Sequence, residues 1–301
     1  MVIMNIPFIK YSKIYYIFSG LLVIASIASI LIFGLKFGID FLGGSILEAE
    51  FKNRPENRLI QEKLIDLNLG EIIIQPTGNN GVILRMSEIN EDTHQKILLK
   101  MNEISEVQEK RFESIGPNIG KELRQKTIFL IIISLIMLLI YIAIAFRKVS
   151  RPIFSWQYGI ISIIALFFDI LIPIGFLALL GKLYNAQFNI PIITAFLTIL
   201  GYTINDKVII FDRVRENIIR SQEFDFETLV EQSLNQTLTR SLSTGSCTLL
   251  VLIAVFFFGG ETLKYFSLIL ILGIIIGTYS SIFLASPLLV TWYHFRLRRN
   301  S

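Results

Sequence analysis

The stretch Pro191-Ile192-Ile193-Thr194-Ala195-Phe196-Leu197 opens an apolar segment that ends in Phe211-Asp212-Arg213-Val214-Arg215-Glu216-Asn217. A charged side chain at the bilayer centre costs about 2.5–3.5 kcal/mol on insertion scales, so such residues usually face the interior of a helix bundle and serve a function. At about 100° per residue, roughly one third of the helix circumference holds the polar residues Thr194, Thr198, Tyr202, Asn205 and Asp206. We interpret the stretch as a membrane-spanning helix whose polar stripe lines an internal path.

The composition excludes a soluble globular protein. The 301 residues are 53% hydrophobic and have a mean hydropathy of +0.62. Several apolar runs approach the roughly 20 residues that span a bilayer. The one cysteine, Cys247, excludes an intrachain disulfide, and two distant histidines, His94 and His294, exclude a Cys/His metal site of ordinary spacing.

Six membrane spans are predicted, at about residues 14–33, 128–146, 153–180, 191–217, 238–258 and 266–292. The first follows Lys10 and Lys13 as a signal peptide would, but it is longer than a signal core and lacks a small-residue cleavage site. We therefore expect it to be retained. The polar residues before the fifth span contain a weakly amphipathic helix, at about 226–237, which we expect at the membrane interface.

Between the first two spans the composition is that of a water-soluble domain. Strands are predicted at 46–51, 71–75, 82–86 and 107–112, and amphipathic helices at 55–67 and 92–104. Gly78-Asn79-Asn80-Gly81 is a strong hairpin signal. The order β-α-β-β-α-β indicates a ferredoxin-like α+β domain, with His94 as an exposed residue of its second helix.

The distribution of basic residues predicts the orientation. Lys and Arg gather near both termini, after the second span (Arg147, Lys148, Arg151) and around the end of the fourth (Arg213, Arg215, Arg220). The positive-inside rule then makes both termini cytoplasmic and sets the soluble domain outside. The predicted organisation is a cytoplasmic N-terminus with the first helix (1–35), a periplasmic α+β domain (36–126), five further helices (127–292) and a basic cytoplasmic tail (293–301).

Asp206 and Arg240 are the strongest candidates for chemistry. The fourth span ends and the fifth begins on the cytoplasmic side, so both residues lie in that half of the membrane and can meet. An arginine favours an ionised aspartate whereas burial favours a protonated one, which suits a group that binds and releases a proton. The alternative is a static salt bridge between two helices. Thr244 and Thr248, on the same face as Arg240, are expected to make interhelical hydrogen bonds, and Cys247 to be a packing residue.

The spans contain further charged and small residues. Asp169 is either a second relay carboxylate or an anchor between helices. Lys207 is expected to extend toward the cytoplasmic headgroups. The four-residue spacing of Gly273, Gly277 and Ser281 predicts close helix packing. Phosphate-binding loops, nucleophile elbows and metal motifs are absent from the sequence, so we expect no enzyme and an ion gradient as the energy source.

Five motifs carry a resemblance that covers nearly the whole chain. They are Gly38-Ile39-Asp40-Phe41 with Gly43-Gly44, Ile115-Gly116-Pro117 with Gly120-Lys121-Glu122-Leu123, Gly201-Tyr202-Thr203-Ile204-Asn205-Asp206, Thr239-Arg240-Ser241, and Gly277-Thr278-Tyr279-Ser280-Ser281-Ile282-Phe283. Together they resemble the SecD/SecF family, and the length resembles its shorter member.

The resemblance implies an RND-type membrane bundle in the bacterial inner membrane. It implies SecD, the SecYEG channel and YajC as partners, with SecA acting first on the translocating preprotein. It implies coupling to H⁺ flow without an organic cofactor or metal, with Na⁺ as the alternative ion. Asp206 and Arg240 match family positions tied to coupling, and we add Asn205 and Asp169. Structural or hinge roles are expected for Gly38, Asp40, Gly43, Gly44, Gly116, Pro117 and Gly277.

The chain departs from the family pattern at two positions. Phe168 stands where the family often has histidine, and Lys207 where threonine is common. Alternative functions are a proton-coupled exporter of a small molecule or lipid, an intramembrane aspartyl protease using Asp169 and Asp206, and a passive scaffold subunit. The exporter shares the fold type, whereas the protease lacks its Gly-x-Gly-Asp motif.

Overall fold

Six helical segments are long and apolar enough to cross a membrane within the described residues, which are 6–67, 69–145, 154–221 and 225–300 of a computed structural model. The segments are Ile9–Phe33, Pro117–Ile142, Trp156–Tyr184, Ile190–Arg220, Phe226–Phe258 and Leu263–Arg298. All six predicted spans are therefore confirmed. The predicted end of the second span at Phe146, the start of the third at Ile153, and the basic residues Arg147, Lys148 and Arg151 lie outside the described residues.

The chain divides into two units, which we describe separately. The membrane unit comprises Met1–Leu35, Ile131–Ala186 and Pro191–Ser301. The α+β unit comprises Lys36–Leu130 and the short segment Gln187–Ile190.

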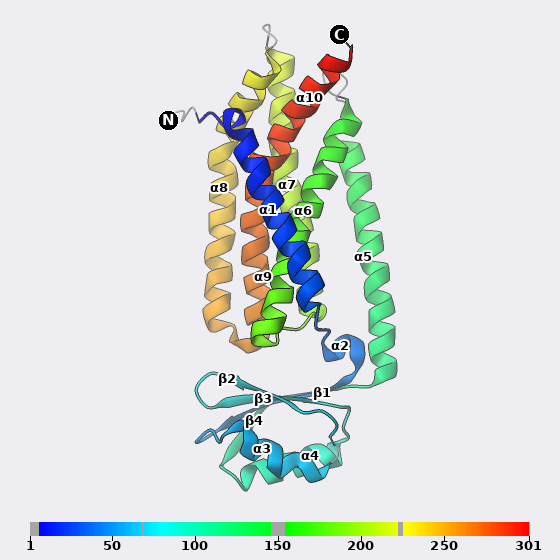
Figure 1. Cartoon of the computed structure of the whole chain (residues 1–301), viewed down its shortest axis with the longest axis vertical. Helices are drawn as coiled ribbons and strands as arrows, with labels where there is room; N and C mark the ends of the chain where they lie inside the picture. The colour runs from blue at the N-terminus through cyan, green and yellow to red at the C-terminus, as the bar shows by residue number, and fades with distance from the viewer. Residues whose placement is uncertain (1–5, 68, 146–153, 222–224, 301) are drawn as a thin grey trace. The chain divides into compact units, whose positions relative to one another are not determined.

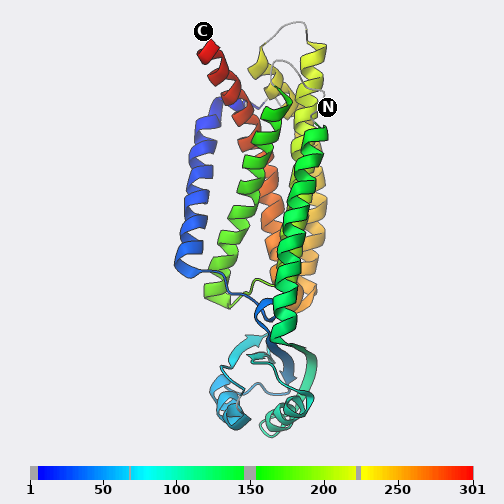
Figure 2. The ribbon, with the colours of Figure 1, turned by 90° about the vertical axis from the view of Figure 1, so that its right-hand side faces the viewer.

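The membrane unit is a helix bundle (Figures 1 and 2). Its elements are η1 (Ile9–Tyr11), α1 (Ser12–Phe33), the second part of α5 (Pro117–Ala145), α6 (Ser155–Tyr184), α7 (Ile190–Arg220), α8 (Phe226–Phe258), α9 (Gly260–Tyr279), the π-helix η3 (Ser280–Ala285) and α10 (Ser286–Asn300). α6, α7 and the last span bury about half or more of their apolar windows, whereas α1, α5 and α8 bury a small share. Helices α6 and α7 and the last span therefore form the centre of the bundle. The basic end of the chain is helical through Asn300.

Helix α8 differs from the expectation. It is one continuous helix of 33 residues, so residues 226–237 are not a separate interfacial helix. Phe226, Val230 and Leu234 are buried in the same apolar cluster as Phe211 and Val214 of α7. The apolar face of this segment thus packs in the bundle, where α7 offers a matching surface, instead of entering the headgroup region.

The close helix packing predicted from the glycine spacing is present between α9 and α7. A Cβ atom at Gly273 would lie 2.2 Å from Cδ1 of Ile199, and one at Gly277 would lie 1.9 Å from Cγ2 of Thr203. Both distances are far below van der Waals contact, so neither position accepts a side chain without a shift of α7.

The α+β unit has the predicted order of elements. They are α2 (Ile39–Leu42), β1 (Gly44–Phe51), α3 (Asn57–Leu64), η2 (Ile65–Leu67), β2 (Ile73–Thr77), β3 (Gly81–Met86), α4 (Glu91–Asn102) and β4 (Val107–Ile115). The antiparallel sheet has the order β2-β3-β1-β4, and the β2–β3 hairpin pairs Thr77 with Gly81. Its core combines Leu47, Phe51 and Leu84 of the sheet with residues of α3 and α4, such as Ile60 and Ile97. This is the ferredoxin-like arrangement (Figure 1).

His94 is buried, contrary to the expectation of an exposed residue. It is 4% exposed and its ring stacks on Phe112 with 3.8 Å between ring centroids. Its Nδ1 lies 3.2 Å from the Glu91 carboxylate, and its Nε2 lies 3.3 Å from Oε2 of Glu109. An imidazole with an apolar face and two carboxylates at its edges is accommodated between α4 and β4, which the helical periodicity alone does not reveal.

The contact between Gly273 and Ile199 yields a stability prediction. Gly273→Ala should destabilise the bundle by about 1–3 kcal/mol, because overpacking forces side chains and backbone apart. It should lower the midpoint of thermal unfolding of the purified protein in detergent. Gly201→Ala on α7, where a Cβ atom meets nothing within 4 Å, is the matched control and should not lower the midpoint, because alanine is the better helix former. In the double variant Gly273→Ala/Ile199→Ala the two effects should be less than additive; full additivity would contradict this packing.

Candidate functional site

The centre of the membrane unit contains a buried ion pair. Asp169 of α6 and Lys207 of α7 are both 0% exposed, and Lys207 Nζ lies 2.6 Å from Asp169 Oδ2. The hydroxyl of Ser280, the first residue of the π-helix η3, donates to Asp169 Oδ1. The Asp169 carboxylate of α6 therefore connects its own helix to α7 and to the last span.

The position of Lys207 contradicts the expectation that it extends toward the headgroups. An ammonium group buried alone would cost far more than the pair does, because a low-dielectric environment penalises an unpaired charge. Asp169 supplies the counter-charge, and the Thr203 carbonyl accepts a second, longer hydrogen bond at 3.5 Å. Sequence reasoning missed Ser280 and this pairing. The available signal was two opposite charges on consecutive spans, Asp169 and Lys207.

Asp206 is buried next to this pair. It is 2% exposed, and its Oδ2 has no hydrogen-bond partner within the described part of the chain. Lys207 and Arg240 attract its carboxylate electrostatically, and Asp169 repels it. Arg240 is exposed in the isolated chain, and no ion pair within 4.0 Å joins it to Asp206 among the described residues. The predicted couple is therefore near enough for electrostatic attraction but is not a closed salt bridge.

The polar stripe of α7 is not enclosed by this chain. Thr194, Thr198 and Asn205 are exposed, and on α8 so are Arg240 and Thr244. The internal path therefore stays a prediction, since this chain by itself leaves most of the stripe exposed. Its buried part is Asp206 with the Asp169–Lys207 pair, and the remainder is an exposed polar face on apolar helices.

The structure bears on two smaller expectations for α8. The hydroxyl groups of Thr244 and Thr248 donate to carbonyls one turn earlier, at Arg240 (2.7 Å) and Thr244 (3.1 Å). Thr248 also lies close to the Tyr202 side chain of α7, so interhelical hydrogen bonding by these hydroxyl groups stays a prediction. Cys247 is exposed, so it is not a packing residue in the isolated chain.

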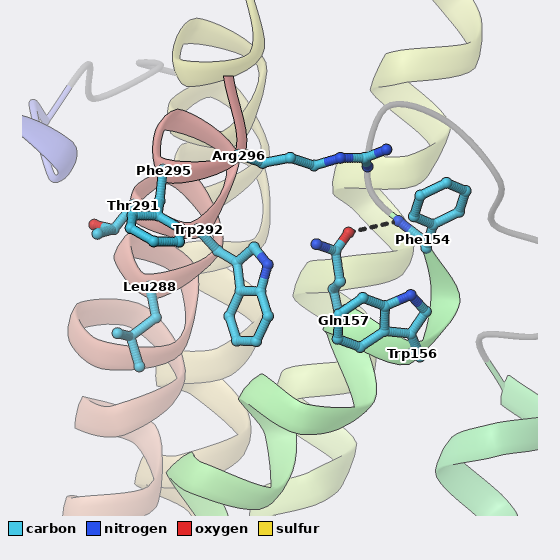
Figure 3. A pocket seen from close by; sticks show the side chains of 8 residues that line it. All are labelled: Phe154, Trp156, Gln157, Leu288, Thr291, Trp292, Phe295 and Arg296. Carbon is cyan, nitrogen blue, oxygen red and sulfur yellow. Dashed lines mark hydrogen bonds between the residues drawn. The ribbon is translucent and has the colours of Figure 1, made fainter. Parts of the chain in front are cut away.

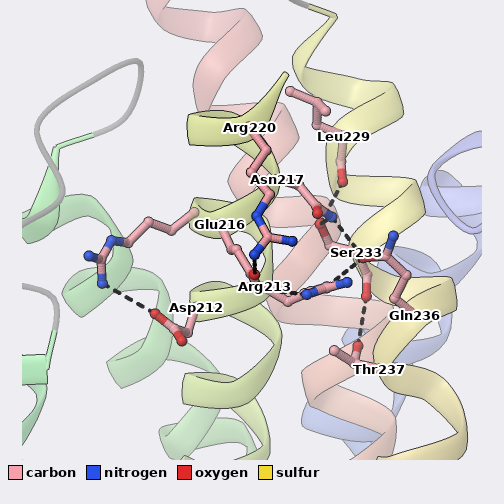
Figure 4. Close-up of polar contacts among 10 residues, drawn as sticks. Asp212, Arg213, Glu216, Asn217, Arg220, Leu229, Ser233, Gln236 and Thr237 are labelled. Atoms are coloured by element: carbon pink, nitrogen blue, oxygen red, sulfur yellow. Dashed lines mark hydrogen bonds and ion pairs between the residues drawn. The ribbon is translucent and has the colours of Figure 1, made fainter. Parts of the chain in front are cut away.

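The end of α7 is held against the start of α8 by a polar network (Figure 4). Arg213 Nε donates to Gln236 Oε1 at 2.5 Å, and Asn217 Nδ2 donates to Ser233 Oγ at 2.8 Å and to Gln236 Oε1 at 2.9 Å. Asp212 accepts from Arg215 at 3.2 Å. The network explains why α8 begins alongside α7.

Within the α+β unit, the residues of the first glycine motif contact the segment that precedes α7. Gly38 N–H donates to the Phe188 carbonyl at 2.9 Å, and Asp40 Oδ2 accepts the N–H of Ile190 at 2.8 Å. Ile190 is the first residue of α7, whose leading N–H groups have no partner within the helix. Asp40 thus ties the exit of α1 to the beginning of the helix that carries Asp206.

The remaining glycine positions are sites of close approach. Gly43 has a φ of +79°, and a Cβ atom there would lie 3.0 Å from both N and Cα of Pro117. A Cβ atom at Gly44 would lie 2.8 Å from the Met86 carbonyl oxygen, and one at Gly116 would lie 3.1 Å from Oε1 of Glu88. The backbone contacts explain the need for glycine at Gly43 and Gly44, whereas the flexible Glu88 side chain at Gly116 can move aside. The hinge role of these glycines stays a prediction, as it does for Gly277.

Comparisons with known proteins place this geometry in context. The family description "Protein export membrane protein SecD/SecF, C-terminal" matches residues 94–295, and "SecD/SecF GG Motif" matches residues 28–53. A protein translocase subunit SecF of Thermobaculum terrenum is 37% identical over 95% of this chain and 94% of that protein. A second SecF, of Anaerolinea thermophila, is 40% identical over 92% and 88%.

Solved structures agree in fold. The crystal structure of SecDF, a translocon-associated membrane protein from Thermus thermophilus, matches with a TM-score of 0.85 and 30% identity. SecDF in a super-membrane-facing form matches with a TM-score of 0.70 and 29% identity. In both cases the match covers 98% of this chain but only 40% of the SecDF chain.

The buried pair leads to a prediction about stability. Lys207→Met should destabilise the bundle by about 3–5 kcal/mol, because Asp169 is left as an uncompensated buried charge. The double variant Asp169→Asn/Lys207→Met should recover most of that loss, because no buried charge remains in the pair. Thermal unfolding of the purified protein in detergent measures both.

Lys126→Met is the control for the loss of a lysine, because Lys126 forms an exposed pair with Glu122 at 2.7 Å and should contribute at most about 1 kcal/mol. A double variant no more stable than Lys207→Met would contradict the assignment of the loss to the unpaired carboxylate.

Proposed function

Because this multi-pass membrane chain belongs to the SecD/SecF family of protein-export membrane proteins, we propose that it is an ion-gradient-driven subunit of a protein translocase. The proposal assigns it to the bacterial inner membrane, beside the SecYEG channel and YajC, where it completes the movement of preproteins that SecA has started. It acts as a transport subunit and not as an enzyme.

The observation that carries the ion-coupling proposal is the buried Asp206 carboxyl group beside the Asp169–Lys207 pair. If all three side chains are ionised, their charges are −1, −1 and +1, and the cluster has a net charge of −1. Uptake of one H⁺ makes the cluster neutral. Since a buried net charge is unfavourable in an apolar surrounding, arrival and loss of a proton at Asp206 change the forces on α7 and its neighbours.

The exposed polar face of α7 and α8 supports a partner in the membrane. Thr194, Asn205 and Arg240 would face hydrocarbon if the chain acted alone, which is unfavourable for an arginine above all. A second membrane protein that covers this face would enclose Asp206 and bring its own polar groups to the site. We propose SecD as that protein. This agrees with the 40% coverage of SecDF, a relative whose single chain is much longer than this one.

We further propose that both termini are cytoplasmic and that the α+β unit is periplasmic. Lys10 and Lys13 lie at the start of the first span, and Arg296 and Arg298 lie at the end of the last. The positive-inside rule assigns these ends to the cytoplasm. Ile190, the first residue of α7, belongs to the α+β unit, where Asp40 accepts its N–H. Helix α7 thus runs without a break from the ion site to a residue of the α+β unit, and we propose that its movement acts on that domain.

The available energy suits such a cycle. One charge that crosses 100 mV supplies about 2.3 kcal/mol. Inverting a two-state equilibrium from 1:99 to 99:1 takes about 5.5 kcal/mol. A few ions per cycle are therefore sufficient.

The proposal predicts the effect of neutralising the ion site. In membrane vesicles, Asp206→Asn or Arg240→Met should abolish the gradient-dependent enhancement of preprotein export, while SecA- and ATP-driven translocation persists. Asp212→Asn is the matched control, because it removes a carboxylate from the same helix that is exposed and paired with Arg215. It should leave the enhancement intact.

Two outcomes would contradict the proposal. An unchanged enhancement in Asp206→Asn would favour a passive scaffold. A sodium gradient that replaces the proton gradient in full would show that Na⁺, and not H⁺, is the coupling ion.

The Asp40 contact gives a second prediction. Asp40→Ala should reduce gradient-dependent export, because α7 loses an acceptor at its first N–H, a type of contact that contributes about 0.5–2 kcal/mol. Asp40→Asn should retain most of the gradient-dependent export, since the asparagine side-chain oxygen can accept the same hydrogen bond. Vesicle export measures both variants at equal protein abundance, and equal defects in Ala and Asn would exclude the hydrogen bond as the cause.

A further inference from the structure

A pocket lies between the start of α6 and the helix α10, within the membrane unit (Figure 3). Its volume is about 760 Å³. The lining residues are Phe154, Trp156, Gln157, Leu288, Thr291, Trp292, Phe295 and Arg296. Neither Asp206 nor the Asp169–Lys207 pair contributes to it, so the pocket is separate from the ion site.

The walls of the pocket are aromatic and apolar. Trp156 and Trp292, the two tryptophans of the chain, meet edge to face with 5.7 Å between ring centroids. Trp156 is the first residue of its apolar span, the position at which tryptophan gathers at the boundary between hydrocarbon and headgroups. The pocket therefore opens where a bilayer presents both an acyl chain and a headgroup.

The polar groups of the pocket are mainly hydrogen-bond donors. The guanidinium group of Arg296 extends from α10 to a position 4.4 Å from the centre of the Phe154 ring (Figure 3). Gln157 is 2% exposed; its Oε1 accepts the Phe154 N–H at 2.8 Å, and its amide nitrogen points toward Trp292 (Figure 3). None of the eight lining residues is acidic. Arg296 and Gln157 thus both bring N–H donors to the lining, and donors of this kind favour an anion with several oxygen acceptors.

We propose that this pocket binds one anionic phospholipid. The phosphate accepts hydrogen bonds from Arg296 and Gln157, and an acyl chain packs on Trp156, Trp292 and Leu288. A soluble phosphate would leave the apolar wall uncovered, whereas a lipid uses both parts of the pocket. Basic pockets between membrane helices recognise anionic headgroups by this combination.

The two tryptophans make the test direct, because both line the pocket and the intrinsic tryptophan fluorescence of the unlabelled full-length protein therefore comes from its walls. The purified protein is reconstituted in bilayers with a small fraction of brominated lipid, a contact quencher, either brominated phosphatidylglycerol or brominated phosphatidylcholine with the same acyl chains. Brominated phosphatidylglycerol should quench more strongly at equal fraction. High salt should reduce the difference, because the preference is electrostatic.

Arg296→Gln should lower the preference for the anionic lipid about fivefold, the factor expected for one basic residue near an anionic surface. Arg298→Gln, two residues along the same helix and outside the pocket, is the matched control with the same change in net charge. It should keep the preference.

Equal quenching by the two brominated lipids would overturn the proposal, as would an equal loss of preference in both arginine variants. A third outcome depends on the membrane partner. If both lipids quench weakly when a SecD-like partner protein is reconstituted together with the chain, and strongly when it is left out, a protein segment occupies the pocket instead.

Discussion

The structure depends on a rule of the membrane interior: a buried charge there must have a partner. Asp169 meets this rule by bonding to Lys207 Nζ at 2.6 Å and accepting from Ser280. Three spans are thereby fixed at one level, and the glycines of α9 let α7 approach closely enough for the contact. Ser280 is the first residue of a π-helix, and its hydroxyl lies at the Asp169 carboxylate. Short π-helical segments of this kind are frequent at functional sites.

Asp206 is different because it is buried without a comparable partner in the described chain. In the proposed function, Asp206 is the carboxyl group that responds to a proton, and the Asp169–Lys207 pair stays closed beside it. The surroundings of Asp206 are also incomplete, since Arg240 and Asn205 are exposed in the isolated chain. The proposed ion site and the proposed partner surface therefore lie on the same face of the molecule.

The spans and the α+β elements could be predicted from the sequence because hydropathy and periodicity are local signals. The sheet order followed from the order of its elements. Pairings between helices are not local, and here the predictions failed: Lys207 pairs with Asp169 and does not extend to the headgroups, and His94 is covered by β4. The continuous helix α8 also depends on contacts with α7, such as Asn217 with Ser233, that periodicity does not contain. The predicted Asp206–Arg240 couple stays a prediction: Arg240 attracts Asp206 electrostatically, but it is exposed in the isolated chain and forms no ion pair with Asp206 among the described residues.

The central claim is that Asp206, and not Asp169, takes up and releases the proton. Infrared difference spectroscopy of the purified protein with its membrane partner, recorded between acidic and alkaline pH, tests it most directly through the C=O stretching band of a protonated carboxylic acid. The account predicts a band that titrates, disappears in Asp206→Asn and persists in Asp169→Asn. A band that persists in Asp206→Asn and disappears in Asp169→Asn would contradict it.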